Sequence, residues 1–244
     1  MECEAMKILL TNDDGIDSKG LWAMARALNK NFEVAIAAPA RQQSGMAHAF
    51  TVWKKIEYWC VENEIEAWAI DGTPTDCVKF YIEEIAKNEK ISAVISGIND
   101  GANLATDVLY SGTVGGALEG FLHEIPVLAV SLVKNSALTF DEVAKITAQY
   151  FSEKIHGGEI FFHNLNFPKN FRNGTAEFKS ARLGKRDYKN AFIRSTENGK
   201  NYFEIRGEVY DIDENEGTDI FAVKNGYVSV TPLHFDVVHH EKIS

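Results

Sequence analysis

Short apolar runs alternate with segments of helical periodicity along the first two thirds of the chain. The runs lack the alternation of apolar and polar residues seen in a strand with one solvent-exposed face. They are therefore typical of parallel-sheet strands that are buried on both faces. Between them, apolar residues recur three or four positions apart, as they do along one face of a helix. Repetition of strand and helix is the pattern of a layered α/β fold.

The pattern places the individual elements. A buried strand begins at Lys7 and stops where the charged pair Asp13-Asp14 begins. Further sheet strands are predicted at Phe32 to Ala38, Ser92 to Ser96, Pro126 to Leu132 and Glu159 to Asn164, the last of which would close the sheet. Helices are predicted at Lys19 to Leu28, over Val78 to Ile85 with Pro74 in the first turn, at Val114 to Leu122 and at Phe140 to Ile155. Thr51 to Tyr58 and Glu66 to Ile70 have the pattern of two exposed strands.

From residue 6 to about 167 this alternation predicts a Rossmann-like, doubly wound, mostly parallel sheet. After Pro168 the composition changes to short β-like segments separated by polar stretches. We therefore expect an α/β core over residues 6–167 and a β-rich C-terminal extension over residues 168–244, which is either an oligomerisation arm or a simple appended lobe. Its expected elements are Phe178 to Arg182, Phe192 to Ser195, Tyr202 to Tyr210, a short helix at Phe221 to Val223, and Tyr227 to Val230.

Composition narrows the functional classes to which this chain could belong. The chain has 244 residues, 45% of them hydrophobic, and a net charge of -10, so it is a poor generic binder of nucleic-acid duplexes or anionic membranes. Its cysteines, Cys3, Cys60 and Cys77, form no CxxC pair, which fits a reducing compartment. The acidic start, Met1 to Ala5, is unlike a signal peptide, and no apolar stretch is long enough to span a membrane. These features predict a cytoplasmic enzyme.

Polar residues follow directly after several predicted strands: Asp13 and Asp14, then Ser44, then Asn99. In an open α/β sheet, ligands bind beyond the carboxyl ends of the strands, so these side chains meet if their strands are neighbours. They offer only oxygen atoms, which suits Mg²⁺, Mn²⁺ or Ca²⁺ and not zinc. For the aspartate pair alone, an equally good interpretation is that one carboxylate caps the next helix and the other is solvated.

A second group of polar residues has the composition of a phosphate site. Ser111, Gly112 and Thr113 stand at a predicted helix start, where free backbone N–H groups, hydroxyls and a glycine could cradle an anion. Simple helix capping by Ser111 or Thr113 is the stronger interpretation of this motif alone. Asn103 is either a ligand-facing amide or a turn residue. The chain contains no P-loop, no GxGxxG, no HExxH and no GxSxG motif.

Taken together and in order, these motifs resemble those of the survival protein SurE family. The matching stretches are Lys7 to Gly15 (KILLTNDDG), Ala38 to Gly45 (APARQQSG), Gly72 to Val78 (GTPTDCV), Ser96 to Leu104 (SGINDGANL), Tyr110 to Val114 (YSGTV) and Gly226 to Leu233 (GYVSVTPL). Each stretch is weak alone, but the ordered series is highly specific.

The resemblance implies a metal-dependent phosphatase of nucleoside monophosphates with a Rossmann-like core. It implies one divalent metal ion per subunit, Mg²⁺ or Mn²⁺, at Asp13, Asp14, Ser44 and Asn99. It places the phosphate near Asn103, Ser111, Gly112 and Thr113. It also implies a C-terminal arm exchanged between subunits, and hence a homodimer or homotetramer.

On this basis we expect hydrolysis of nucleoside 5′-monophosphates, with 3′-monophosphates as a further substrate class, by attack of a metal-activated water. Asp13 or Asp14 would take the proton of that water. Two alternatives stay open at this stage. In one, Asp13 is a nucleophile that forms an aspartyl-phosphate. In the other, the chain is a nucleotide-binding or scaffold module without turnover.

Overall fold

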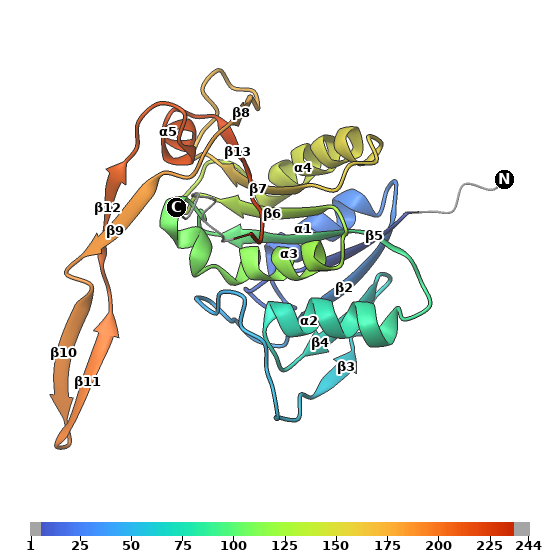
Figure 1. Cartoon of the computed structure of the whole chain (residues 1–244), viewed down its shortest axis with the longest axis horizontal. Coiled ribbons are helices and arrows are strands. Elements are labelled where there is room, and N and C mark those ends of the chain that lie inside the picture. The colour runs from blue at the N-terminus through green and yellow to red at the C-terminus, as the bar shows by residue number, and fades with distance from the viewer. Residues whose placement is uncertain (1–5, 237–244) are drawn as a thin grey trace, which may run out of the picture.

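A computed structural model of the chain describes residues 6–236 (Figure 1). The acidic segment Met1 to Ala5, with Cys3, lies outside the described residues. Within residues 6–236, none of the helices combines the length and apolar character that a membrane crossing requires. The chain is built around one large sheet, with a narrow β-arm that projects from one end (Figure 1).

The large sheet has nine strands in the order β3-β4-β2-β1-β5-β6-β7-β13-β8. From β4 to β7 all neighbours are parallel, while β3 and β13 run antiparallel to their neighbours β4 and β7. The Rossmann-like, mostly parallel fold is thus confirmed. The strands are β1 (Lys7–Thr11), β2 (Glu33–Pro39), β3 (Tyr58–Cys60), β4 (Glu66–Ile70), β5 (Ile91–Asp100), β6 (Val127–Leu132), β7 (Phe162–Phe167), β8 (Phe178–Ser180) and β13 (Val228–Pro232).

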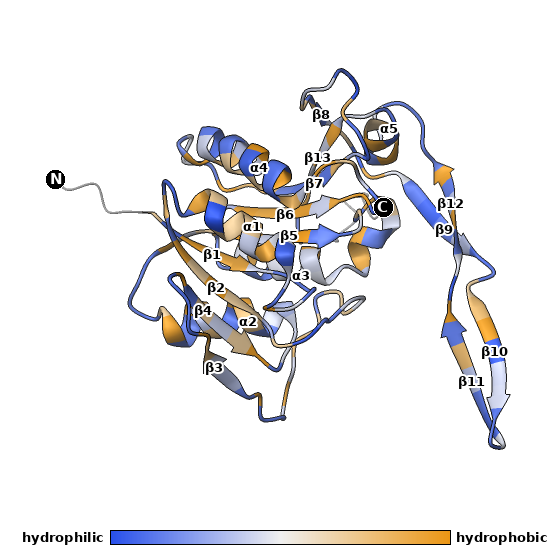
Figure 2. Ribbon diagram, turned by 180° about the vertical axis from the view of Figure 1, so that it is seen from behind, coloured by the Kyte–Doolittle hydropathy of each residue, from blue (hydrophilic) through white to orange (hydrophobic). Residues whose placement is uncertain are grey.

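Helices cover both faces of this sheet. On one face α1 (Lys19–Leu28) packs against α4 (Phe140–Ile155), and on the other α2 (Pro74–Phe80), continued by the π-helical turn Tyr81–Ile85, packs against α3 (Gly112–Leu122). Successive residues of a strand point to opposite faces. Accordingly, Ile8 and Leu10 of β1 join the core under α1 and α4, while Leu9 joins the core under α2 and α3. Figure 2 shows the apolar character of the central strands.

Helix α1 lies unusually close to the sheet at Gly20. A Cβ atom at this position would lie 2.2 Å from the carbonyl oxygen of Ile98 in β5, so only glycine fits there. The contact fixes the start of α1 beside the carboxyl end of β5.

We therefore expect Gly20→Ala to destabilise the fold by at least about 1–3 kcal/mol, the cost of overpacking a rigid core. Helix propensity alone predicts that this substitution stabilises the fold, since alanine is more favourable than glycine in a helix interior. Urea unfolding of the variant measures the difference. Gly157→Ala is the matched control, because its added Cβ would meet nothing closer than a carbonyl oxygen at 3.3 Å. A Gly20→Ala variant as stable as the control would contradict the packing described.

Three expectations about strands were wrong. Residues 51–57 form a loop and not a strand, because Thr51 donates from N and Oγ1 to the buried Asp76 carboxylate at 2.9 and 2.7 Å. The adjoining β4 is largely buried and not exposed, since it pairs with β2 inside the sheet. Strand β7 lies later than Glu159 to Asn164 and does not close the sheet, because β13 and β8 add to it from the C-terminal part of the chain.

The arm consists of two antiparallel ribbons. Its strands are β9 (Lys185–Lys189), β10 (Phe192–Glu197), β11 (Lys200–Ile205) and β12 (Glu208–Asp213), so the predicted segment Tyr202 to Tyr210 is divided between two strands. At its base Arg186 binds Asp211 at 2.8 Å and Asp107 at 2.9 Å, and helix α5 (Asp219–Lys224) follows. Further out the arm exposes apolar side chains, including Phe192, Phe203 and Ile205. Figure 2 shows apolar stretches in the β10–β11 ribbon.

Candidate active site at the carboxyl edge of the sheet

The aspartate pair follows β1 in a turn that sends the two side chains to different partners. The side chain of Asn12 closes this turn, with Oδ1 accepting from the Gly15 N–H at 3.2 Å and Nδ2 donating to the Gly15 carbonyl at 3.0 Å. The Asp13 carboxylate is buried and accepts a 2.5 Å hydrogen bond from the Thr113 hydroxyl. The half-buried Asp14 carboxylate accepts from the backbone N–H of Asp100 at 3.3 Å.

Burial disfavours the charged forms of both carboxylates. It raises the pKa of Asp13 to about 6, with the Thr113 hydrogen bond acting in the opposite direction and the charge of Asp14 adding to the rise. The pKa of Asp14 is also raised by burial, while the Asp100 N–H and the charge of Lys134 lower it. In the described part of the chain neither aspartate forms an ion pair with Lys, Arg or His. The pair is therefore a concentration of negative charge to which a cation would be strongly attracted.

Helix α3 approaches Asp13 through Gly112. A Cβ atom at Gly112 would lie 2.8 Å from Cβ and 3.1 Å from Oδ2 of Asp13, so a larger residue would push the helix start away. Ser111 is the N-cap of α3, and its Oγ accepts from the Val114 N–H at 3.1 Å. The helix cap expected at Ser111 is present, and the start of α3 also lies against Asp13. The N–H groups of Gly112 and Thr113 lie in the first turn beside the carboxylate.

The loop after β2 brings Ser44 to the same edge. The backbone N–H of Gln43 donates to the Asp13 carbonyl at 2.7 Å, and Ser44 itself is exposed, accepting at Oγ from Gln42 at 3.0 Å. On its other side the loop is bound to α3 by His48 Nε2 and the buried Glu119 at 2.8 Å.

Asn99 lies within β5 and not in a loop after it, since this strand runs to Asp100. Its Nδ2 donates to the Gly101 carbonyl at 2.7 Å, which leaves Oδ1 available to a ligand. β5 is the parallel neighbour of β1, with Thr11 opposite Ser96. Asn99 therefore ends beside the Asp14 turn, and the Asp100 N–H bond to Asp14 joins the two segments.

The donor set fits a hard divalent cation. Asp13, Asp14, Ser44 and Asn99 supply carboxylate, hydroxyl and amide oxygens from segments that the hydrogen bonds above hold together. Among residues 6–236 no group of three or more His, Cys, Asp or Glu side chains could hold a metal ion. Two carboxylates with neutral oxygens are a donor set typical of sites that leave room for water or substrate.

Asn103 occupies a different environment from Ser111, Gly112 and Thr113. It is buried, its N–H donates to Asn166 Oδ1 at 2.7 Å, and its Nδ2 donates to Ser131 Oγ at 2.9 Å. Its carbonyl accepts from Asn164 and Asn166. No hydrogen bond joins Asn103 to the start of α3 in the described structure. One hydrogen of its side-chain amide is thus already used in binding the loop to β6, while its backbone binds the loop to β7.

Two residues at this edge have no counterpart in the sequence-based site. Asp100 borders Asp14 through its N–H, and Lys134 lies against Gly101 and lowers the pKa of Asp14 by its charge. Lys134 follows β6 just as the other motifs follow their strands. That position is the signal that could have identified it.

By its fold the chain is a Rossmann-like α/β protein in which further strands extend both ends of the parallel sheet, with a polar, oxygen-rich site at the carboxyl edge. A family model described as "Survival protein SurE" matches residues 8–190. The chain belongs to this family.

Relatives of known name match along nearly the whole chain. The "5'-nucleotidase SurE" of Thermoanaerobacter sp. (strain X514) is 38% identical over 244 residues, covering 98% of this chain and 96% of that protein. The protein of the same name from Caldanaerobacter subterraneus subsp. tengcongensis is 40% identical over 247 residues, covering 97% and 94%. A crystal structure of the SurE protein from Aquifex aeolicus matches with a TM-score of 0.82 at 36% identity, covering 96% of this chain and 95% of that one.

Proposed function

We propose that the chain is a metal-dependent phosphomonoesterase that hydrolyses nucleoside 5′-monophosphates, with 3′-monophosphates as a second substrate class, to nucleoside and phosphate. The nucleotidase relatives support the class of enzyme, a phosphoric monoester hydrolase. One observation carries the proposal for this chain's own residues. The buried Asp13 carboxylate accepts a hydrogen bond from Thr113 in the first turn of α3, which supports a cation site of oxygen ligands next to a helix start suited to an anion.

The metal, Mg²⁺ or Mn²⁺ at one ion per subunit, would be held by Asp13, Asp14, Ser44 and Asn99. When bound it supplies charge neutralisation at phosphate and a lowered pKa for the attacking water. Asp13 or Asp14 would take the proton from the attacking water. The N–H groups of Gly112 and Thr113 and the Ser111 hydroxyl donate toward the phosphate oxygens and stabilise the charge that develops on them. Asn103 contributes through the remaining hydrogen of its amide group.

A panel of phosphomonoesters crossed with a panel of divalent metals tests this assignment. We expect release of phosphate from nucleoside 5′-monophosphates with Mg²⁺ or Mn²⁺. The same panel reports the preferred base, the 5′ or 3′ position and the preferred metal. Absence of phosphate release from every ester, under every metal, would favour the alternative of a binding module without turnover, for which nucleotide binding persists in chelator.

The aspartyl-phosphate alternative is disfavoured by the surroundings of Asp13. Its carboxylate is buried, accepts from Thr113 and lies against Gly112, so little room is left for in-line attack by this carboxylate on phosphorus. A phosphoenzyme trapped on Asp13 by acid quench would establish the alternative and overturn water attack.

We also propose a cytoplasmic homodimer or homotetramer assembled through the arm. The arm supports this because Phe192, Phe203 and Ile205 project from one face of the β10–β11 ribbon, where pairing sets Phe192 opposite Ile205. Exposed apolar patches of this kind mark interaction surfaces. The acidic composition and the free thiols of Cys60 and Cys77 support the cytoplasm.

We expect the double variant Phe203→Lys, Ile205→Lys to lower the molar mass in sedimentation velocity, because lysines on this face would have to be buried without partners. Glu204→Lys, on the opposite face of the same strand, is the control and should keep the wild-type mass. Equal masses for the wild type and the double variant would contradict assembly through this face.

A further inference from the structure

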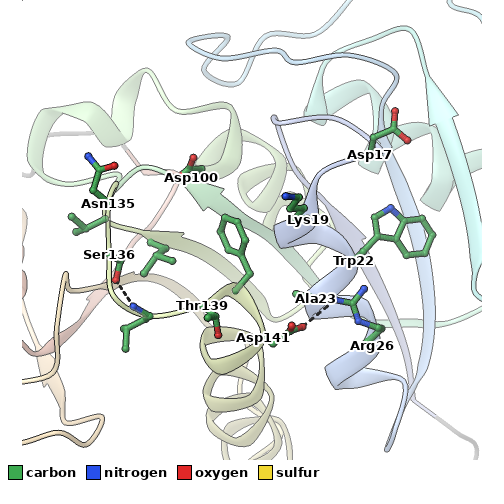
Figure 3. Close-up of a pocket in the computed structure, with 14 residues that line it drawn as sticks. Asp17, Lys19, Trp22, Ala23, Arg26, Asp100, Asn135, Ser136, Thr139 and Asp141 are labelled. Atoms are coloured by element: carbon green, nitrogen blue, oxygen red, sulfur yellow. Dashed lines mark hydrogen bonds and ion pairs between the residues drawn. The ribbon is translucent and has the colours of Figure 1, made fainter.

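Different structures adjoin the site on the two faces of the sheet. On the α1–α4 face, a groove of about 620 Å³ lies between the first turns of α1 and the segment that leads into α4 (Figure 3). In the described structure it meets the site only through Asp100, whose N–H donates to Asp14. On the α2–α3 face, the loop after β2 passes Ser44 and then lies against α3. This second contact bears on where an oxygen ligand of the site lies.

Ser44 is not held in place by its own side chain. It is exposed, and within residues 6–236 its hydroxyl is hydrogen-bonded only to Gln42, two residues away in the same loop. Gly45 follows with a φ of 75°, and a Cβ added there would meet no atom within 4 Å. Ligands on loops are precise only when neighbouring contacts support them. The position of the Ser44 oxygen therefore depends on contacts made elsewhere in the loop.

The loop reaches α3 at Ala47 and α2 at Ala49. A Cβ atom at Gly115 of α3 would lie 2.1 Å from the Ala47 carbonyl oxygen, so the loop backbone lies directly on the helix. The Ala47 N–H donates to the Tyr110 carbonyl at 3.1 Å. Its φ of 52° is left-handed, a conformation that an alanine keeps only where its surroundings hold it. The Thr73 hydroxyl donates to the Ala49 carbonyl at 2.7 Å.

Between these two points, His48 binds a carboxylate that is buried in α3. Its Nε2 lies 2.8 Å from Oε2 of Glu119, while Oε1 of Glu119 faces Lys79 at 3.5 Å and His123 at 3.6 Å. Burial alone would raise the pKa of Glu119, but the His48 hydrogen bond and the charges of these neighbours hold it below its ordinary value. An ionised carboxylate only accepts, so Nε2 of His48 carries the proton. Hydrogen bonds to a charged partner are among the stronger ones in proteins.

Helix α3 thereby links two segments that carry oxygen ligands. In its first turn, Thr113 donates to the Asp13 carboxylate at 2.5 Å. Six residues later, Glu119 binds the loop that carries Ser44. The same rigid element thus contacts both segments, and the His48–Glu119 hydrogen bond is the side-chain link on the Ser44 side.

We propose that the His48–Glu119 pair positions the Ser44 loop on α3 and so places the Ser44 hydroxyl within reach of a cation bound at Asp13 and Asp14. The proposal rests on the proposed function, because it takes Ser44 as a metal ligand. Both members of the pair are positioning residues, since each acts through Ser44. A neutral hydroxyl adds to metal affinity chiefly when it is held at the site in advance, because binding then costs less ordering.

Three substitutions separate positioning from packing. His48→Ala removes the hydrogen bond, and His48→Gln keeps an N–H donor that can reach Glu119. His123→Ala is the matched control, because it removes an imidazole beside the same carboxylate but belongs to the end of α3 and not to the loop. The fold should survive each change, since Lys79 and the remaining histidine still face Glu119.

Three measurements follow the effect. Calorimetric titration with Mn²⁺ reports metal binding in the absence of any ester. Amide hydrogen exchange over residues 43–49 reports local opening of the loop in the metal-free protein. Phosphate release from a nucleoside 5′-monophosphate, at a series of Mn²⁺ concentrations, reports how much metal half-maximal activity requires.

We expect His48→Ala to weaken Mn²⁺ binding by about 10–100-fold, the usual loss when a group that orients a metal ligand is removed. Exchange in the loop should become faster, and the Mn²⁺ concentration for half-maximal phosphate release should rise by a similar factor. His48→Gln should restore most of the affinity, and His123→Ala should change none of the three measurements. In a Ser44→Ala background, His48→Ala should cause no further loss, because no ligand is left to position.

Wild-type Mn²⁺ affinity in a folded His48→Ala protein would overturn the proposal. So would an equal loss in His123→Ala, or a full further loss when His48→Ala is added to Ser44→Ala. Mn²⁺ binding that depends on both His48 and Ser44, without phosphate release from any ester, would sustain the positioning role and refute the phosphatase function instead.

Discussion

Replacing Asp14 with asparagine is expected to lower metal-dependent kcat/KM for a nucleoside monophosphate by at least about 10³-fold, since a metal contributes several kcal/mol of transition-state stabilisation and each 1.36 kcal/mol is tenfold. The change removes one of only two carboxylates in the donor set. The fold should persist, because burial already disfavours the charged form and raises the pKa of Asp14. Phosphate-release kinetics over a range of Mg²⁺ and Mn²⁺ concentrations measure the loss.

The matched control is Glu153→Gln, which removes an exposed carboxylate on α4 far from the sheet edge. It should retain wild-type activity, and the unfolding free energies of both variants should lie within about 1 kcal/mol of the wild type. Near wild-type turnover in a folded Asp14→Asn protein would reject this site.

The second large effect is expected for Gly112→Ala. The added methyl would lie 2.8 Å from Asp13 Cβ and 3.2 Å from the Gln43 carbonyl, so the start of α3, Asp13 and the Ser44 loop cannot all keep their positions. A displacement of about 1 Å in catalytic groups costs on the order of 10²-fold in rate. We therefore expect kcat to fall about that much, as measured by phosphate release at saturating substrate.

Thr113→Ser serves as the control for Gly112→Ala. It is the next residue of the same helix turn, and it keeps the hydroxyl that binds Asp13 without adding volume. It should retain most of the activity. A Gly112→Ala enzyme with wild-type kcat would show that close approach of α3 to Asp13 is not needed for turnover.

Much of the fold follows from local patterns. The apolar runs of β1, β2 and β6 and the periodicity of α1 and α4 lie in the sequence itself, because buried parallel strands and amphipathic helices leave strong, regular signals. The same logic finds polar residues after each strand. Asp13, Asp14 and Ser44 can therefore be proposed as neighbours from the sequence alone, since parallel strands bring their carboxyl ends to one edge.

What could not be predicted depends on long-range contacts. Thr51 is withdrawn from a strand by the Asp76 carboxylate, and β13 joins the sheet between β7 and β8 through antiparallel pairing with β7 and parallel pairing with β8. Asn103 is engaged by Ser131, Asn164 and Asn166, partners from strands far along the chain. No local spacing encodes these pairings, so propensity and periodicity cannot supply them.

The groove beside Asp14 could not be predicted for the same reason. Its residues come from segments after β1, β5 and β6, and each is ordinary in its own stretch of sequence. Lys19, Trp22 and Arg26 have the pattern of ordinary helix residues, and only the fold brings them to one side of this groove (Figure 3). A charged residue is informative when its surroundings are known.

Removal and return of the metal tests the central claim most directly. Purified protein is treated with chelator, dialysed and assayed with a nucleoside 5′-monophosphate before and after addition of Mg²⁺ or Mn²⁺. The account predicts no phosphate release after chelation, full recovery with metal, and no recovery in Asp14→Asn. Phosphate release that continues unchanged in the chelated protein, or fails to appear with any metal while the nucleotide still binds, would contradict it.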